Sequence, residues 1–192
     1  MGQAMQAWLR APSPAMGGEC ELTFMDRAAI DPARAGGQHA AYAAALREAG
    51  LLVTVLPLLA GHADCAFIED CLVLVPEARQ AIATRPGAMS RQGEVASALA
   101  GLGEGWNHAA IVAPGTLEGG DVLRLGRRLY VGHSSRTNAA GIAQLAALVA
   151  PAGLEVVAVP VAGALHLKTA VTALGEGLFA ANRDWFDPAP FG

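Results

Sequence analysis

The chain has 192 residues, 13 of them Lys or Arg and 17 Asp or Glu, for a formal net charge of −4. Hydrophobic residues make up 53% and charged residues 16%, a composition that excludes an intrinsically disordered protein. The excess of acidic over basic residues argues against a protein that binds nucleic acid through its overall charge. The apolar stretches are too short, and too often broken by Gly or Pro, to predict a membrane span.

Cellular location is indicated by the amino terminus and the cysteines. The first ten residues, MGQAMQAWLR, lack the apolar run and small-residue cleavage site of a secretory signal. The three cysteines, Cys20, Cys65 and Cys71, are odd in number and have no CxxC spacing. Free thiols in the cytoplasm are therefore expected.

Three helices are predicted in chain order. The first begins after Asp31-Pro32, a helix cap followed by proline in the first turn, and extends to Arg47. The second is expected over residues 91–100 with Ser90 as its cap, and the third over residues 139–150 with Asn138 as its cap. Strands are predicted between them, at residues 51–58, 67–75, 109–113, 121–125, 129–132, 155–161 and 178–181.

An internal repeat organises these elements. Residues 49–57 read AGLLVTVLP and residues 152–160 read AGLEVVAVP, and residues 103–114 form a weaker copy. The predicted strands that end near Pro57, Pro114 and Pro160 therefore indicate modules of about 50 residues. An ionisable cluster follows each proline, so the turns of the modules are expected to converge on one site.

The candidate binding residues form two complementary sets. Convergent loop carboxylates suit a planar cation such as a guanidinium, and an arginine at a helix start suits a carboxylate. Both sets together fit arginine or a derivative of it. The alternatives, solvated loop carboxylates and a solvated helix-start arginine, stay open. The acidic set is Asp64, Glu69, Asp70, Glu118 and Asp121, and the basic set is Arg85, Arg91 and Arg136.

His166 is the candidate acid/base, because the acidic loops can orient its imidazole and favour its protonation. A histidine between two leucines can also be purely structural. The five histidines show no zinc-site spacing, and no nucleotide-binding glycine motif occurs. Neither a metal nor a cofactor is therefore expected.

The chain resembles the dimethylarginine dimethylaminohydrolases of the arginine deiminase and amidinotransferase superfamily. The matching segments run through nearly the whole chain and include FIED at 67–70, RPGA at 85–88, LEGGD at 117–121, RTN at 136–138 and LHLKT at 165–169. The resemblance implies a pentein-type α/β propeller of repeated βαβ modules in a single domain over residues 1–192. It also implies hydrolysis of dimethylarginine to citrulline and a methylamine.

The resemblance assigns a role to each matching residue. His166 is implied as the acid/base, with Glu118 supporting it. Asp70 is implied to bind the guanidinium, with Glu69 and Asp64 nearby. The remaining roles are a loop over the ligand carrying Leu22, and Arg91 and Arg136 at the α-amino-acid end. The implied partner is a small-molecule substrate, without nucleic acid or membrane, and a homodimer stays open.

The nucleophile of the family is a cysteine near the carboxyl terminus, and no residue here matches its motif. Four modules of about 50 residues account for this length, whereas five would need about 250. We therefore expect a chain that lacks the last module and its cysteine. The alternatives are a related arginine deiminase or other guanidine-modifying enzyme, and a protein that binds arginine derivatives without turning them over.

Overall fold

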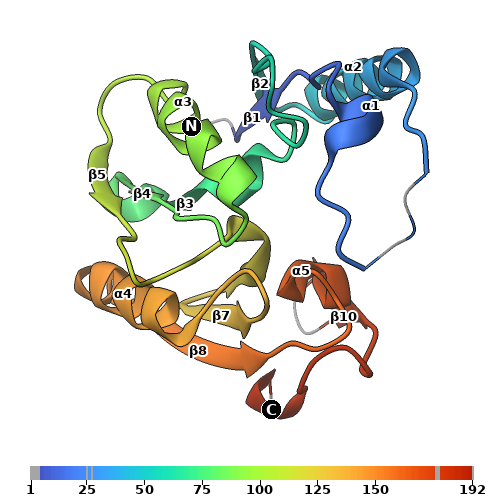
Figure 1. Cartoon of the computed structure of the whole chain (residues 1–192). Coiled ribbons are helices and arrows are strands. Elements are labelled where there is room, and N and C mark those ends of the chain that lie inside the picture. Colours follow the sequence, from blue (N-terminus) through green and yellow to red (C-terminus); the bar gives the residue numbers. More distant parts are fainter. Residues whose placement is uncertain (1–4, 25, 27, 176–177, 192) are drawn as a thin grey trace. The chain divides into compact units, whose positions relative to one another are not determined.

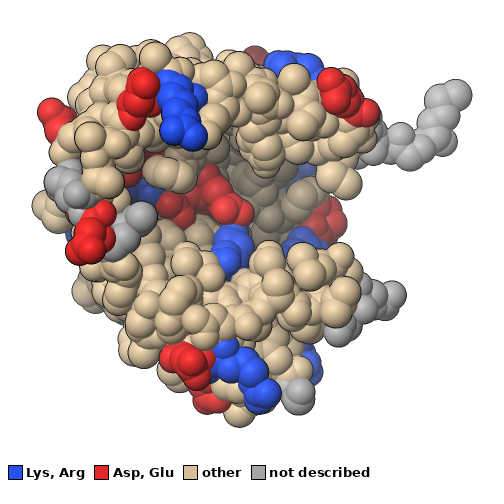
Figure 2. All heavy atoms as spheres, turned by 90° about the vertical axis from the view of Figure 1, so that its right-hand side faces the viewer, with Lys and Arg blue, Asp and Glu red and all other residues tan. Residues whose placement is uncertain are grey.

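The computed structural model describes residues 5–24, 26, 28–175 and 178–191 of the chain. The chain forms two compact units, residues 1–68 with 100–102 and residues 69–99 with 103–192. Uncharged residues make up most of the face shown in Figure 2. Among the described residues, no helix combines the length and the apolar character that a membrane crossing requires.

The first unit contains one parallel strand pair and two helices. Strands β1 (Gln6–Arg10) and β2 (Leu52–Leu56) pair in parallel, and the chain between them forms α1 (Met16–Glu19) and α2 (Pro32–Glu48). As predicted, the Asp31 carboxylate caps α2, accepting hydrogen bonds from the backbone N–H groups of Ala33 (2.9 Å) and Arg34 (3.2 Å). The α2 helix contacts β2, the strand that follows it (Figure 1).

The second unit contains three sheets in chain order. Its helices and strands are β3 (Leu72–Val75), β4 (Gln80–Ala83), α3 (Val95–Ala100), β5 (Asn107–Ala110), β6 (Val122–Leu125), β7 (Arg128–His133), α4 (Ala139–Val149), β8 (Glu155–Pro160), α5 (Leu167–Ala170), β9 (Val171–Gly175) and β10 (Leu178–Ala181). Short 3₁₀ helices cover Ile68–Cys71, Pro76–Ala78, Met89–Glu94, Gly119–Asp121, Ala150–Ala152 and Ala189–Phe191. The α3 helix ends at Ala100, where residues 100–102 belong to the first unit.

The predicted repeat is present in the second unit. The antiparallel β3–β4 hairpin is followed by a helical segment and by β5, which pairs in parallel with β4. The antiparallel β6–β7 hairpin is likewise followed by a helical segment and by β8, which pairs in parallel with β7. The β9–β10 hairpin begins a third copy. Each hairpin is preceded by a short helical turn, and Asp70, Glu118 and His166 lie on or directly before these three turns.

The main core of the second unit lies between α4 and the two three-stranded sheets. The α4 helix lies along β7 and β8 (Figure 1). Asn138 caps α4 as predicted, because its side-chain oxygen accepts from the Gly141 N–H at 2.8 Å. Leu145 and Val149 of this helix are fully buried with Ile82 and Val131 of the strands. This core supports the turns that precede β3 and β6.

Three predicted elements need correction. The predicted strand 67–75 begins as a 3₁₀ turn, and only residues 72–75 are β-strand. The predicted helix 91–100 also begins in a 3₁₀ segment, Met89–Glu94, so that Ser90 lies inside it and does not cap it. The predicted strand 109–113 lies at 107–110. Strands β1, β4 and β9 lie outside the strands predicted above.

Candidate active site

Three of the candidate residues meet in the second unit. Asp70 lies on the turn before β3, Glu118 directly precedes the turn before β6, and His166 directly precedes α5. Each of the three side chains is buried, and each places one oxygen or nitrogen within 4.8 Å of those of the other two. The equivalent turns of successive repeats therefore bring two carboxylates and an imidazole to one point.

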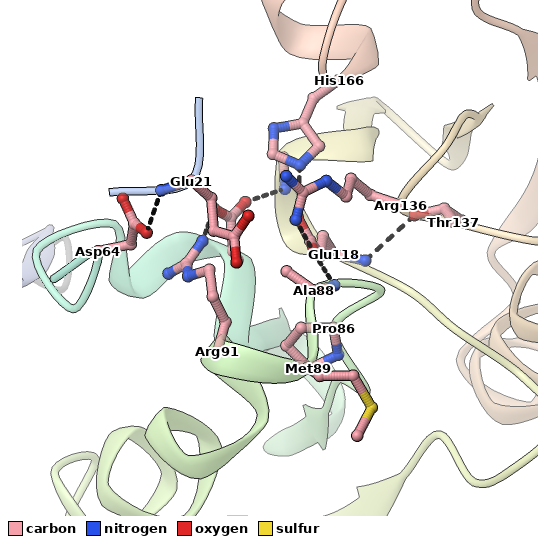
Figure 3. Close-up of polar contacts among 12 residues, drawn as sticks. Glu21, Asp64, Pro86, Ala88, Met89, Arg91, Glu118, Arg136, Thr137 and His166 are labelled. Atoms are coloured by element: carbon pink, nitrogen blue, oxygen red, sulfur yellow. Dashed lines mark hydrogen bonds and ion pairs between the residues drawn. The ribbon is translucent and has the colours of Figure 1, made fainter. Parts of the chain in front are cut away.

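Glu118 is the centre of this cluster, and it is 1% exposed. Its Oε2 lies 2.6 Å from Nε2 of His166, and its Oε1 accepts from the Ala88 N–H at 3.2 Å. The Arg136 guanidinium lies 3.7 Å from the same Oε1. Figure 3 shows His166, Arg136 and Ala88 gathered around the Glu118 carboxylate.

The pKa shifts of this pair follow from its contacts. Burial by itself lowers the pKa of His166, but the hydrogen bond with Glu118 and the charges of Asp70, Asp121 and Glu118 outweigh it, so the pKa is raised above its ordinary value. Burial raises the pKa of Glu118, but the bonds from His166 and Ala88 and the charge of Arg136 outweigh it and lower the pKa. The site therefore favours an imidazolium paired with a carboxylate.

We predict that Glu118→Gln lowers the pKa of His166 towards its ordinary value of about 6.5. In the wild type, the pair stabilises the fold fully below the unfolded pKa of histidine, and this stabilisation is lost as the pH rises through the raised pKa of the folded state. An NMR titration of the His166 ring measures the shift, with His166→Gln identifying its signal. Glu77→Gln, which alters an exposed pair with Arg124, is the control. An unchanged His166 titration in Glu118→Gln would contradict the coupling.

A second buried network holds Asp70. Its Oδ2 lies 2.5 Å from the Arg91 guanidinium, and its Oδ1 accepts from the Gly120 N–H at 2.8 Å. Arg91 also binds Glu94 at 2.8 Å. Burial lowers the pKa of Arg91, but Glu94 and Asp70 outweigh it and the pKa is raised, so this guanidinium stays charged. The 3₁₀ geometry of residues 89–94 explains the Arg91–Glu94 contact, because side chains three positions apart are eclipsed in such a helix.

This network differs from the sequence expectation in one respect. Asp70 and Arg91 were assigned to opposite ends of a ligand, and the structure pairs them directly. Glu94 was not foreseen at all, although it lies three residues after Arg91 and is 1% exposed. The sequence indicates Glu94 only by its position three residues after a candidate arginine, which is one turn of a 3₁₀ helix.

The buried cluster of the second unit is rich in carboxylates. Four of them, of Asp70, Glu94, Glu118 and Asp121, accompany two buried arginines, Arg91 and Arg136. Asp70, Glu94 and Glu118 are paired with these arginines or with His166, whereas burial raises the pKa of Asp121. The carboxylate oxygens gathered here suit a cationic ligand that has several N–H donors.

Asp70, Glu118 and His166 also form a group that could hold a metal ion. The sequence did not indicate such a group, because its members are far apart in the chain. In the structure, however, the Asp70 carboxylate is paired with Arg91, and that of Glu118 with His166 and Arg136. Ion pairs within the protein therefore already use the atoms that a metal would need.

The glycine pair before β6 makes room for the cluster. A Cβ atom on Gly120 would lie 2.5 Å from Nδ1 of His166 and 2.7 Å from Oδ1 of Asp70. A Cβ atom on Gly119 would lie 2.0 Å from the Glu69 carbonyl oxygen. The absence of a side chain at both glycines therefore leaves space for neighbouring protein groups.

The remaining candidates lie elsewhere. Glu69 is exposed, and its carboxylate pairs with Lys168, two residues after His166. Asp64 and Leu22 belong to the first unit. There the buried Asp64 carboxylate accepts from the Glu21 N–H at 2.9 Å, and the half-buried Leu22 packs against a small cluster around Met16. Arg85 donates to the Gly115 carbonyl oxygen at 3.3 Å.

Comparison with solved structures establishes the class of protein. A Pseudomonas aeruginosa DDAH solved in complex with citrulline superposes with a TM-score of 0.85 at 33% identity, over 94% of this chain and 70% of that one. The N-terminal domain of ArgZ, a cyanobacterial arginine dihydrolase, superposes with a TM-score of 0.77 at 20% identity, over 96% and 69%. The protein therefore has the α/β fold that these pentein structures share.

Sequence comparison identifies the family. A dimethylarginine dimethylaminohydrolase of Streptomyces coelicolor is 43% identical over 175 residues, and one of Pseudomonas aeruginosa is 37% identical over 164 residues. They cover 90% and 84% of this chain, which spans 66% and 63% of their lengths. No protein-family model matches the chain. The chain belongs to the dimethylarginine dimethylaminohydrolase family.

Proposed function

We propose that the protein acts in the hydrolysis of N-methylated arginine to citrulline and a methylamine. The observation that carries this proposal is the buried cluster around Glu118, in which the carboxylates of Asp70 and Glu118 lie beside a histidine whose pKa is raised. A guanidinium is a planar cation, and its N–H groups match carboxylate oxygens. The relatives named above bear the name of this activity.

We assign the ligand ends as follows. Asp70 binds the guanidinium, and Arg136 with Arg91 holds the α-carboxylate. His166 protonates the leaving methylamine and then activates water, and Glu118 holds its imidazole. Glu69 completes this part of the ligand site, and the roles that the resemblance implies for Asp64 and Leu22, both in the first unit, stay predictions.

In this assignment the Asp70–Arg91 ion pair has to open as the first step of ligand binding. The Arg91 guanidinium binds the Asp70 carboxylate, the group to which our assignment gives the guanidinium of the ligand. A methylated arginine can exchange with it, because both groups present the same planar donors to one carboxylate. Arg91 is then released towards the carboxylate of the ligand, as the sequence-based assignment requires.

The covalent step needs a thiolate that attacks the guanidinium carbon. The C–N bond to the methylated nitrogen then breaks, His166 supplies the proton to the leaving amine, and water releases citrulline and the thiol. None of the three cysteines suits this role in our proposal. Cys71 is buried, and its Sγ lies 3.7 Å from a Glu94 oxygen, where a carboxylate disfavours the thiolate. We propose a five-module propeller as the complete fold, with the nucleophile outside these 192 residues.

Calorimetry with NG,NG-dimethylarginine tests the binding proposal. We expect binding by the 192-residue chain and a loss of about tenfold or more in affinity for Asp70→Asn, since a charge-assisted bond is removed. Glu77→Gln, at an exposed ion pair, is the matched control and should bind like the wild type. Equal affinities for wild type and Asp70→Asn would refute the guanidinium assignment.

A citrulline assay on the same chain separates the alternatives. Binding without turnover fits the proposal, and also fits a protein that binds arginine derivatives only. Adding the carboxyl-terminal third of a full-length relative to this chain distinguishes these two. Turnover can be restored only if the 192-residue chain contributes its own part of a working active site. Turnover of free arginine in preference to the methylated form would indicate a deiminase. Turnover by a chain with all three cysteines replaced by serine would overturn the proposed covalent step.

A further inference from the structure

Asp121 is a buried carboxylate to which the proposed reaction gives no task. It is 0% exposed and lies at the end of the turn before β6. Burial raises its pKa, against hydrogen bonds from Thr137 and Ser134. Keeping such a group away from water is costly unless its bonds serve a purpose.

One oxygen of Asp121 is bound next to His166. Oδ1 accepts from the backbone N–H of Leu167 at 2.9 Å. Leu167 is the first residue of α5, and His166 directly precedes it. The bond therefore fixes the backbone at the point from which the imidazole extends towards Glu118.

The other oxygen is bound to the loop that carries Arg136. Oδ2 accepts from the Ser134 hydroxyl at 2.7 Å. The Ser134 oxygen in turn accepts from the N–H groups of Arg136 (3.0 Å) and Thr137 (3.2 Å). A hydroxyl that both donates and accepts in this way holds the loop in one conformation.

The chain of bonds closes on Glu118. The Thr137 hydroxyl accepts from the Glu118 N–H at 3.1 Å, and the Glu118 carboxylate binds His166. Beginning at Asp121, the bonds thus pass through Ser134, Thr137, Glu118 and His166 and return through the residue beside His166. The backbone leaves room for this arrangement at Gly132, where a Cβ atom would lie 2.4 Å from Asp121 Oδ1.

We propose that Asp121 is a positioning residue that sets the placement of His166 and Arg136 around Glu118. It does so through two hydrogen bonds, called its two arms below, one from the Leu167 N–H to Oδ1 and one from the Ser134 hydroxyl to Oδ2. The identity of the positioned groups as a methylarginine site rests on the proposed function. The positioning itself is a property of the bonds and can be tested without a ligand.

Amide hydrogen exchange tests each arm. Asp121→Ala should speed exchange at the amides of Leu167, Arg136 and Thr137. Amides of the β6–β7 hairpin should exchange faster only by the amount that any loss of global stability explains. Ser134→Ala should speed exchange at Arg136 and Thr137 only. Leu145→Ala, a core substitution outside the ring of bonds, is the control for lost stability and should affect all amides alike.

Affinity for NG,NG-dimethylarginine supplies the functional readout. We expect a loss of about tenfold or more for Asp121→Ala. Asp121→Asn, which keeps an acceptor for Leu167, should fall between wild type and Asp121→Ala. An Asn variant as weak as the Ala variant would show that charge alone matters, and would overturn positioning.

The two proposals can fail separately. If the wild type does not bind the methylated arginine, the proposed function fails, and the exchange pattern still decides on Asp121. If Asp121→Ala speeds exchange uniformly, as Leu145→Ala does, Asp121 has a general structural role and the inference is wrong. Should Asp121→Ala fail to fold, Ser134→Ala and Asp121→Asn decide in the same way.

Discussion

Replacing Arg91 with methionine should lower the free energy of unfolding by about 3–5 kcal/mol. Arg91 is 4% exposed, and its guanidinium bridges Asp70 and Glu94. Methionine fills much of the same volume but leaves two carboxylates buried without their cation. Urea unfolding at neutral pH measures the loss.

Two comparisons make this prediction specific. Arg128→Met removes an arginine of the same type from its ion pair with Glu155, which is more than half exposed, and should leave unfolding nearly unchanged. A triple variant with Asp70→Asn, Arg91→Met and Glu94→Gln removes the charges together and should recover part of the loss. Equal effects of Arg91→Met and Arg128→Met would contradict the buried network.

Gly120→Ala should destabilise the fold by about 1–3 kcal/mol, the usual cost of overpacking a buried site. The added methyl would meet the His166 ring and the Asp70 carboxylate. Either group can yield only by giving up its present contacts. We therefore expect a weakened affinity for the methylated arginine and a His166 pKa nearer the ordinary value, measured by calorimetry and NMR titration.

Gly175→Ala is the matched control for this substitution. It lies in β9, no atom of the described residues lies within 4 Å of an added Cβ, and its backbone angle is not left-handed. Its unfolding should be unchanged or slightly strengthened, because alanine restricts the unfolded chain. A Gly120→Ala protein with wild-type stability and His166 titration would show that the loop relaxes freely, and would contradict the close packing described for it.

Much of the fold follows from local chemistry that the sequence displays. Asp31 and Asn138 cap α2 and α4 as predicted, since a cap is read from neighbouring residues. The β6–β7 hairpin follows from Gly126, whose positive φ of 58° suits the turn. The repeat was visible because β2 and β8 end beside or at similar prolines, Pro57 and Pro160.

The errors arise where tertiary contacts override local preference. Residues 67–71 look like a strand, yet Asp70 turns inward to bind Arg91 and the Gly120 N–H. The start of the 91–100 helix tightens for the same reason, since Arg91 must reach Asp70 and Glu94 together. A local sequence pattern cannot identify the partner of a buried ion pair that lies 21 residues away in the chain.

The short helical turns before β3, β6 and β9 have a consequence for how this protein family diversifies. Each turn precedes a hairpin, yet Asp70 lies within the first turn, Glu118 directly before the second with its two glycines, and His166 directly before the third. The turns are also bonded to one another, because Asp70 accepts from the Gly120 N–H and Asp121 accepts from the Leu167 N–H. A regular scaffold can thus hold an irregular set of reactive groups, but a substitution in one turn is felt in the next, so new chemistry has to evolve through linked changes in several turns.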